Sequence, residues 1–309
     1  MSRPSTTQWE RWGDGDEIGR LNLNDQAAVL DALKIPRTGA VWPLGQRFFG
    51  GADLPNFPER PTPQHLMYRD WSHYLAGRSA VQAGGGASVD DGFMLSCHGG
   101  THVDALGHVI VDGAMWGGRD AVDTIGGLRH CDVSAMSAHG LICRAVLVDI
   151  VSWRGKGPLP RHEHIRLADV LACLAWQGVE PARGDMLLLR TGSLERYRLE
   201  GAGKFWAGYS EPGLTDEPEL LSWIDEVDLL GIGTDSLANE LPVSPLTGLD
   251  FQLHKHLLRD RGLQFHEALW LADLAADCAQ DRVYDGLYLA SPLMMVGASG
   301  SPMNPLFVK

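Results

Sequence analysis

The segment from His98 to His108 constrains this chain more than any other feature of its sequence. It holds four side chains that bind divalent metal ions, and all of them stand at even positions: His98, His102, Asp104 and His108. In an extended strand these side chains would share one face, because strand side chains alternate between two faces. A straight segment would place His98 and His108 roughly 33 Å apart, at about 3.3 Å per residue. The chain must therefore fold back on itself if all four act in one site.

Three glycines make such a reversal possible, namely Gly99, Gly100 and Gly107, since glycine adopts positive φ angles without steric cost. We expect a metal site here, because neutral imidazole and ionised carboxylate are the ligands that divalent transition metals prefer. His102 and Asp104 could hold one ion without any bend. Cys97 stands at an odd position, so we expect it to face away from the site as a small buried residue.

The composition narrows the range of partners. The 309 residues include 26 lysines and arginines against 39 acidic residues, which gives a formal net charge of −13. Because no basic run interrupts this acidic balance, we expect neither nucleic acid nor a membrane surface as a partner. Because the sequence contains no apolar run of membrane-spanning length and no apolar core near residue 1, we expect neither a membrane span nor a signal peptide. Its five scattered cysteines form no C-x-x-C pair, which favours a reducing, cytoplasmic location without structural disulfides.

Apolar periodicity predicts an α/β or α+β fold with a mixed sheet. We expect buried strands at 145–151, 186–190, 227–232, 263–269 and 287–296, and helices at 26–33, 167–176, 217–224, 251–259 and 271–278. The glycine-rich stretch 83–87 is interpreted as a mobile lid or linker. Because no shift in composition marks a boundary, we expect a single domain over residues 1–309, with 1–60 as an N-terminal extension packing on it.

A second histidine-rich stretch runs from His254 to Glu267. On a helix, His254 and His256 would point about 200° apart, so only one of them can face a given site. On a strand, His266 and Glu267 would lie on opposite faces. The sequence therefore leaves open which member of each pair is functional.

The pattern His98-x-Gly100-Thr101-His102-x-Asp104, followed by His108, resembles the signature of the cyclase family of metal-dependent hydrolases. That family includes bacterial kynurenine formamidases and isatin hydrolases. The family signature has proline where this chain has Leu106, so the departure concerns the turn that precedes His108. Three further segments are similar to the longer bacterial members, at 9–24, 231–236 and 297–305.

This resemblance implies a single domain with a swivelling β/β/α fold, a homodimer or homotetramer, and hydrolysis of a carbon–nitrogen bond in an amide, formamide or cyclic amide. The implied substrate is a small aromatic or cyclic molecule. The implied cofactor is Zn²⁺ or Mn²⁺, as one or two ions, held by a first set His98, His102 and Asp104 and a second set Asp104, His254 and Glu267. His108 would be catalytic, transferring a proton from the metal-activated water to the leaving nitrogen.

Other functions fit the same residues. A lactone hydrolase, or a lyase or cyclase acting on a similar ring, would use the same motif. Two histidines and one carboxylate also describe the metal site of non-haem iron oxygenases. A non-catalytic metal-binding protein would need an ion closed off by protein ligands. Trp71 and Trp116 lie near the motif in sequence and could contact a flat substrate, although we expect both to pack in the core.

Overall fold

The computed structural model describes residues 7–49, 55–155 and 157–309. Within them, one large mixed sheet of nine strands has the order β1-β13-β11-β5-β7-β9-β10-β4-β12. The central strands β5, β7, β9 and β10 run parallel, and the pairs on either side are antiparallel. The bounds are β1 (Val41–Pro43), β4 (His102–Asp104), β5 (Leu141–Asp149), β7 (Met186–Arg190), β9 (Gly231–Thr234), β10 (Gln264–Glu267), β11 (Asp285–Ala290), β12 (Gly300–Pro302) and β13 (Leu306–Val308).

Both faces of this sheet are covered. Along β5, Ala145 and Leu147 join one apolar core, whereas Val146 and Val148 join the other. The first core is closed by α3 (Val133–His139) and α8 (Ala272–Asp281), and the second by α5 (Leu167–Gln177) and α7 (Pro218–Val227). The predicted mixed α/β fold is therefore confirmed, and burial on both faces explains why the central strands are continuous apolar runs.

The remaining helical segments connect these layers. They are the α-helices α1 (Gln26–Ala32), α2 (Trp71–Leu75), α4 (Ile150–Trp153) and α6 (Ser193–Trp206), the short 3₁₀ turns η1 (Trp9–Trp12), η2 (Gly19–Leu23), η3 (Leu106–His108), η4 (Trp116–Gly118) and η5 (Ala121–Thr124), and the π-helical segment η6 (His254–Arg259). Two smaller sheets pair β2 (Gln64–Arg69) with β3 (Asp90–Met94) and β6 (His164–Ile165) with β8 (Gly213–Leu214). Among the described residues, no helix is both long and apolar enough to span a bilayer.

Most predicted elements are present, but several boundaries were wrong. The strand expected at 227–232 begins only at Gly231, because α7 continues to Val227 and ends where Asp228 adopts a φ of 60°. The strand expected at 287–296 ends at Ala290, and Pro292 follows, which has no N–H to donate to a sheet. An apolar run in the sequence indicates which residues are buried, but buried residues also continue beyond the ends of a strand, so the run does not define the strand boundary.

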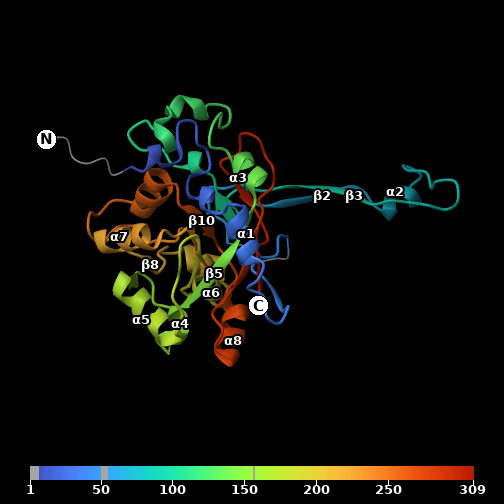
Figure 1. The fold of residues 1–309 in the computed structure, drawn as a ribbon. Helices are drawn as coiled ribbons and strands as arrows, with labels where there is room; N and C mark the ends of the chain where they lie inside the picture. The colour runs from blue at the N-terminus through green and yellow to red at the C-terminus, as the bar shows by residue number, and fades with distance from the viewer. Residues whose placement is uncertain (1–6, 50–54, 156) are drawn as a thin grey trace.

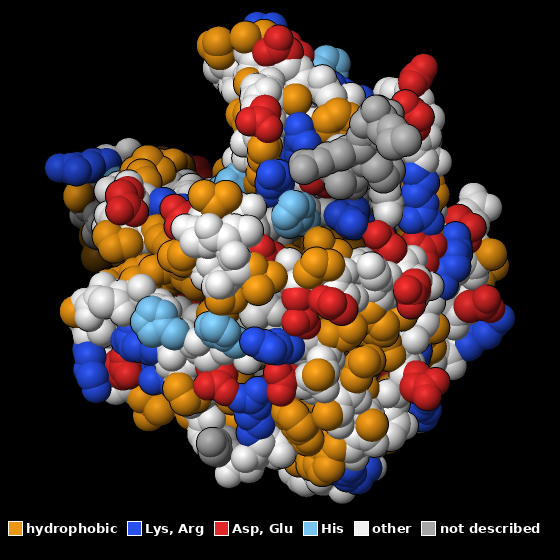
Figure 2. Space-filling model, turned by 90° about the vertical axis from the view of Figure 1, so that its left-hand side faces the viewer, with side chains coloured by type: hydrophobic (Ala, Val, Ile, Leu, Met, Phe, Trp, Pro, Cys, Tyr) orange, Lys and Arg blue, Asp and Glu red, His pale blue; other side chains and the backbone are white. Residues whose placement is uncertain are grey.

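The segment that contains β2, α2 and β3 extends away from the large sheet and its helices. Figure 1 shows β2, β3 and α2 extending as a long arm to one side, and the glycine-rich stretch 83–87 lies within this arm. On the face turned away from the arm, acidic and basic side chains are interspersed (Figure 2). That view of the described residues shows no continuous basic surface of the kind that nucleic acid requires.

Candidate metal centre

The His98–His108 segment folds back as its spacing predicts. The imidazole rings of His98 and His108 stack with centroids 4.1 Å apart. Of the three glycines, only Gly100 uses a positive φ, of 63°, and it directly precedes Thr101 and β4. On β4, His102 and Asp104 share one face while Val103 enters the apolar core on the other. Alternation along a three-residue strand thus places two of the four side chains.

The turn after β4 places His108. Leu106, which replaces the family's proline, is fully buried in the second core and holds the 3₁₀ turn η3 in place. The backbone N–H of His108 donates to the carbonyl of Ala105 at 2.9 Å, and that of Gly107 donates to the carbonyl of Cys131 at 3.0 Å. Packing and hydrogen bonds therefore fix this turn without a proline ring.

The second half of the site comes from β10, which lies antiparallel to β4 with Glu267 opposite His102. Glu267 shares its strand face with Phe265, and the His266 ring turns to the other face, where its Nδ1 lies 2.7 Å from the hydroxyl of Tyr288. Strand alternation thus places Glu267, and not His266, on the face of the cluster.

Of the two histidines on η6, only His254 faces the cluster. His254 is buried and its Nε2 faces the carboxylates of Asp104 and Glu267, at 3.6 and 3.4 Å. His256 instead lies with its Nδ1 3.6 Å from Asp260, outside this cluster. Helical segments with π geometry often occur at functional sites.

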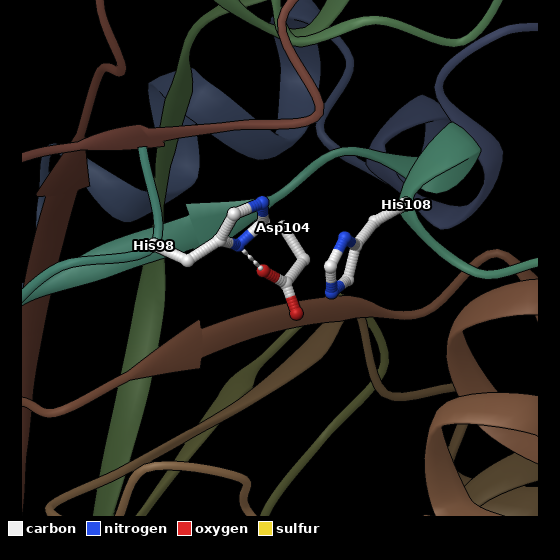
Figure 3. A group of neighbouring side chains, drawn as sticks. All are labelled: His98, Asp104 and His108. Atoms are coloured by element: carbon white, nitrogen blue, oxygen red, sulfur yellow. Dashed lines mark hydrogen bonds and ion pairs between the residues drawn. The ribbon is translucent and has the colours of Figure 1, made fainter. Parts of the chain in front are cut away.

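The six predicted site residues thus lie together: five of them form two overlapping groups, and His254 faces Asp104 and Glu267 beside them. In one, ligand atoms of His98, Asp104 and His108 lie within 4.8 Å of one another, and in the other those of His102, Asp104 and Glu267 do. Figure 3 shows the side chains of the first group pointing toward one another, with His98 Nδ1 2.8 Å from Asp104 Oδ1. In the second group, His102 Nε2 lies 3.5 Å from Asp104 Oδ1 and 3.3 Å from Glu267 Oε2. Asp104 belongs to both groups and lies at the centre of the cluster.

This donor set fits a divalent cation. Asp104 Oδ2 is buried and has no hydrogen-bond partner among the described residues, a costly state for a carboxylate oxygen. Several imidazole nitrogens stand at 3.3 to 3.6 Å from carboxylate oxygens, longer than good hydrogen bonds. When each ligand atom lies about 2.0–2.2 Å from a shared metal ion, neighbouring ligand atoms are separated from one another by distances close to these.

The electrostatics of the cluster favour positive charge. Burial opposes ionisation of Asp104, but His108, His102, His254 and His98 outweigh it and hold the pKa of Asp104 well below its ordinary value. Burial likewise opposes protonation of His102, yet hydrogen bonds with Asp104 and Glu267 raise its pKa to about 9. At His108 burial dominates and lowers the pKa to about 4. Two ionised carboxylates in a buried pocket draw cationic charge to themselves, whether protons or a metal ion.

Four residues that support the cluster were not identified from the sequence. Glu240 accepts hydrogen bonds from the backbone N–H groups of Leu253 and His254 and lies 2.6 Å from His254 Nδ1. Asn239 donates to Glu267 Oε1 at 3.2 Å, and the Ser299 hydroxyl lies 2.9 Å from His98 Nε2. Gly300 lets β12 approach, since a Cβ there would lie 2.6 Å from the His98 ring. Ser299 and Gly300 lie in the family-like segment 297–305, but Glu240 and Asn239 lie outside the motifs found in the sequence, so only their position in space identifies them.

A cavity of about 720 Å³ opens onto the cluster. Its floor carries His98, His102, His108, His254 and Glu267. Its walls combine apolar and charged side chains: Phe57, Glu59, Arg60, Val109, Ile110, Val111, Leu237, Ala238, Leu249, Asp250, Phe251, Gln252 and Lys255. This volume suits a small-molecule ligand.

Three other sequence expectations have clear outcomes. Trp116 is buried in the core as predicted, with its Nε1 donating to Asp16 at 3.0 Å. Trp71 was expected to pack in the core, and this was wrong, because it lies exposed on the arm. Cys97 is half-buried rather than buried.

Comparisons with known proteins show the family and the fold. Residues 33–240, more than half of the chain, match the sequence profile of the family described as "Putative cyclase". The protein in a crystal structure described as a novel cyclase has 31% sequence identity to this chain, and the two structures match with a TM-score of 0.86 over 98% of this chain and 99% of that one. Isatin hydrolase A from Ralstonia solanacearum is 22% identical, with a TM-score of 0.60 over 92% and 95% of the two chains. An isatin hydrolase bound to the product analogue thioisatinate is 18% identical, with a TM-score of 0.60 over 86% and 90%. No match was found among curated proteins.

The fold and the site together define a mixed α/β protein whose sheet carries a buried cluster of histidines and carboxylates at the floor of a cavity. The match over residues 33–240 and the 31% identity over nearly the whole chain show its family. The chain belongs to the cyclase family, as the motif around His98 to His108 predicts.

Proposed function

We propose that this protein is a metal-dependent hydrolase that cleaves a carbon–nitrogen bond in an amide, formamide or cyclic amide. The observation that carries the proposal is the buried Oδ2 of Asp104, which has no hydrogen-bond partner among the described residues and lies 3.6 Å from His254 Nε2 beneath an open cavity. Similarity in fold to isatin hydrolases, one of them with the product analogue thioisatinate bound, supports a ring amide as substrate.

The residues divide into two ligand sets around Asp104. His98 and His102, with nitrogens 2.8 and 3.5 Å from Asp104 Oδ1, would hold one zinc or manganese ion together with Asp104, and Asp104, His254 and Glu267 would hold a second. The structure groups these residues differently, with His108 beside His98 and Asp104, and Glu267 beside His102 and Asp104. A divalent ion bound there supplies Lewis acidity, which lowers the pKa of a bound water and polarises a carbonyl group. Glu240 and Ser299 orient the rings of His254 and His98 through their second nitrogens.

His108 is proposed as the proton carrier. Its ring lines the cavity and stacks on His98, so one imidazole nitrogen can take a proton from water and return it to the leaving nitrogen. Phe57 and Phe251 in the cavity wall would pack on a flat substrate, and Arg60 would hold an anionic group formed from its carbonyl. Because the cavity reaches the cluster, a substrate has access, which distinguishes this arrangement from a closed structural metal site.

The test is metal analysis of the purified protein, followed by a hydrolysis screen over aryl formamides, isatin-like lactams and lactones with oxygen uptake recorded. Asp104→Asn is expected to lose both metal and activity, whereas His108→Ala is expected to retain metal and lose activity by a factor of about 10²–10⁴. His256→Ala, which lies outside the cluster, is the matched control and is expected to keep both. Loss of metal in His108→Ala would make His108 a ligand, and oxygen uptake without hydrolysis would refute the hydrolase.

A further inference from the structure

The turn of residues 237–240 carries two side chains that orient members of the proposed second ligand set. Asn239 donates to Glu267 Oε1 at 3.2 Å, and Glu240 Oε1 lies 2.6 Å from His254 Nδ1. The first two residues of the same turn line the cavity above the cluster. The contacts that hold this turn in place therefore also set the positions of two proposed ligands and of part of the cavity wall.

The turn has a strained backbone. Asn239 adopts a φ of 56°, which lies in the left-handed region that is uncommon for residues other than glycine. The backbone N–H of Glu240 donates to the carbonyl of Ala238, only two residues earlier, at 2.6 Å. A strained conformation persists where the surrounding structure imposes it, and such conformations cluster at functional sites. Neighbouring segments must therefore supply the contacts that keep this turn in place.

The buried segment 210–214 holds the end of the turn. Leu214 donates its backbone N–H to the carbonyl of Asn239 at 3.4 Å, and its own carbonyl accepts from the N–H of Leu241 at 3.2 Å. Gly213 permits this approach, since a Cβ there would collide with the backbone of Glu240. Backbone contacts thus fix the turn where it ends.

The side chain of Glu211 holds the start of the turn. Glu211 is 1% exposed, and its Oε2 accepts from the backbone N–H of Leu237 at 2.9 Å. The same oxygen accepts from the hydroxyl of Tyr209 at 2.9 Å. The Tyr209 ring packs edge-on against Phe57, which lines the cavity, with centroids 5.4 Å apart. One buried carboxylate oxygen therefore connects the turn to a second part of the cavity wall.

We propose that Glu211 is a positioning residue of the metal centre, which acts through the turn 237–240 on Glu267 and His254. The inference rests on the proposed function, because it takes these two residues as ligands of an ion. An apolar side chain at position 211 would leave the buried N–H of Leu237 without its acceptor. Because an unpaired buried donor is costly, the turn would shift and release the two side chains that orient the ligands.

The first experiment measures zinc affinity by titration against a chromophoric chelator, with the thermal midpoint recorded in parallel. Glu211→Leu is expected to weaken zinc binding by about 10- to 100-fold, the range typical of residues that orient metal ligands. Glu211→Gln retains an acceptor oxygen and is expected to retain most of the affinity. A Glu211→Leu protein that is folded and binds zinc as tightly as the unmodified protein would overturn the proposal, as would a Glu211→Gln protein as weak as Glu211→Leu.

Asp185→Asn is the matched control for the first experiment. Asp185 is another buried carboxylate, 3% exposed, and it accepts hydrogen bonds from Arg144 and from the backbone of Ala182. None of these three residues lines the cavity. The control is therefore expected to lose stability and to keep its zinc affinity, and a loss of affinity equal to that of Glu211→Leu would refute a specific role for Glu211.

The second experiment separates positioning from a general loss of stability. If Glu211 acts through the turn, its effect overlaps with that of Glu240→Gln. The double variant with Glu211→Leu is then expected to lose less affinity than the product of the two single losses, by at least about twofold. Ser299→Ala acts on His98, in the other ligand set, and its loss is expected to multiply with that of Glu211→Leu. Independent losses with Glu240→Gln, or the same overlap with Ser299→Ala, would contradict the proposal.

The third experiment tests the inference apart from the proposed function. In a crystal structure of metal-free Glu211→Leu protein, the Asn239–Glu267 hydrogen bond and the Glu240–His254 contact are expected to be lost or lengthened from 3.2 and 2.6 Å. Retention of both contacts would overturn the proposal. Absence of zinc binding in the unmodified protein would instead refute the proposed function, and the structure of the variant would still decide whether Glu211 positions the two side chains.

Discussion

Replacing Glu240 by glutamine is expected to weaken metal binding by 10- to 100-fold, although Glu240 is not proposed as a ligand. Its Oε2 accepts from the backbone N–H of Leu253 at 2.6 Å, and its Oε1 accepts from the backbone N–H of His254 at 2.9 Å and lies 2.6 Å from His254 Nδ1. An amide nitrogen at either oxygen position would direct its hydrogens at a donor. At least one charge-assisted hydrogen bond is lost, which costs about 1.5–3 kcal/mol.

That cost matches the effect known for residues that orient metal ligands, about 10- to 100-fold in affinity, or roughly 1.4–2.7 kcal/mol. The assay is a zinc titration in competition with a chromophoric chelator, with the thermal midpoint measured in parallel. Glu195→Gln is the matched control. The Glu195 carboxylate forms an ion pair with Arg190, with an N–O distance of 2.7 Å, and neither residue lines the cavity. Unchanged zinc affinity in folded Glu240→Gln protein would refute the view that Glu240 positions His254.

Two other predictions concern buried or half-buried charges. Arg60 lines the cavity, with its guanidinium 4.9 Å from the Phe57 ring centroid. Arg60→Met is therefore expected to weaken the binding of benzoate, measured by calorimetry, by about tenfold, or about 1.4 kcal/mol, and to leave the binding of benzamide unchanged. Equal effects on both ligands would contradict an anion-binding role. Burial raises the pKa of Glu211 to about 7, so between about pH 4.5 and 7 the folded state keeps a proton that the unfolded state has lost. The free energy of unfolding, measured by urea unfolding, should therefore fall by about 3 kcal/mol as pH rises through that range. The Glu211→Gln variant should lack this pH dependence. The same pH dependence in the variant would assign the effect to another group.

The half of the site that comes from residues 98–108 could be predicted because it depends on local geometry. The spacing of His98, His102, Asp104 and His108 defines one strand face and a required reversal, and both are present. The reason for the reversal differs in part: Gly100 uses its positive φ, whereas Gly107 is needed for close packing, since a Cβ there would lie 2.8 Å from a methyl carbon of Leu128. Local spacing limits where a chain can turn, and tertiary packing decides which residue makes each turn.

The far half could not be predicted from spacing, because it depends on which strands become neighbours. Glu267 enters the site only because β10 pairs with β4 in the register that sets it opposite His102, and a shift of one residue would present His266 instead. Periodicity predicts a strand at 263–269, where the structure has β10 (Gln264–Glu267), but it contains no information on the partner strand β4, far earlier in the chain.

The ambiguity between His254 and His256 has the same origin and suggests a general criterion. Both histidines lie on η6, and their types and spacing give no reason to prefer either. What separates them is the acid that holds each ring: Glu240 holds His254 toward Asp104 and Glu267, whereas Asp260, on the same segment as His256, holds that ring away. A ligand histidine needs one nitrogen for the ion and a fixed acceptor for the other. For His254 the orienting group is an acid, Glu240, which lies on a different part of the chain, and the sequence spacing of the two histidines contains no information about it.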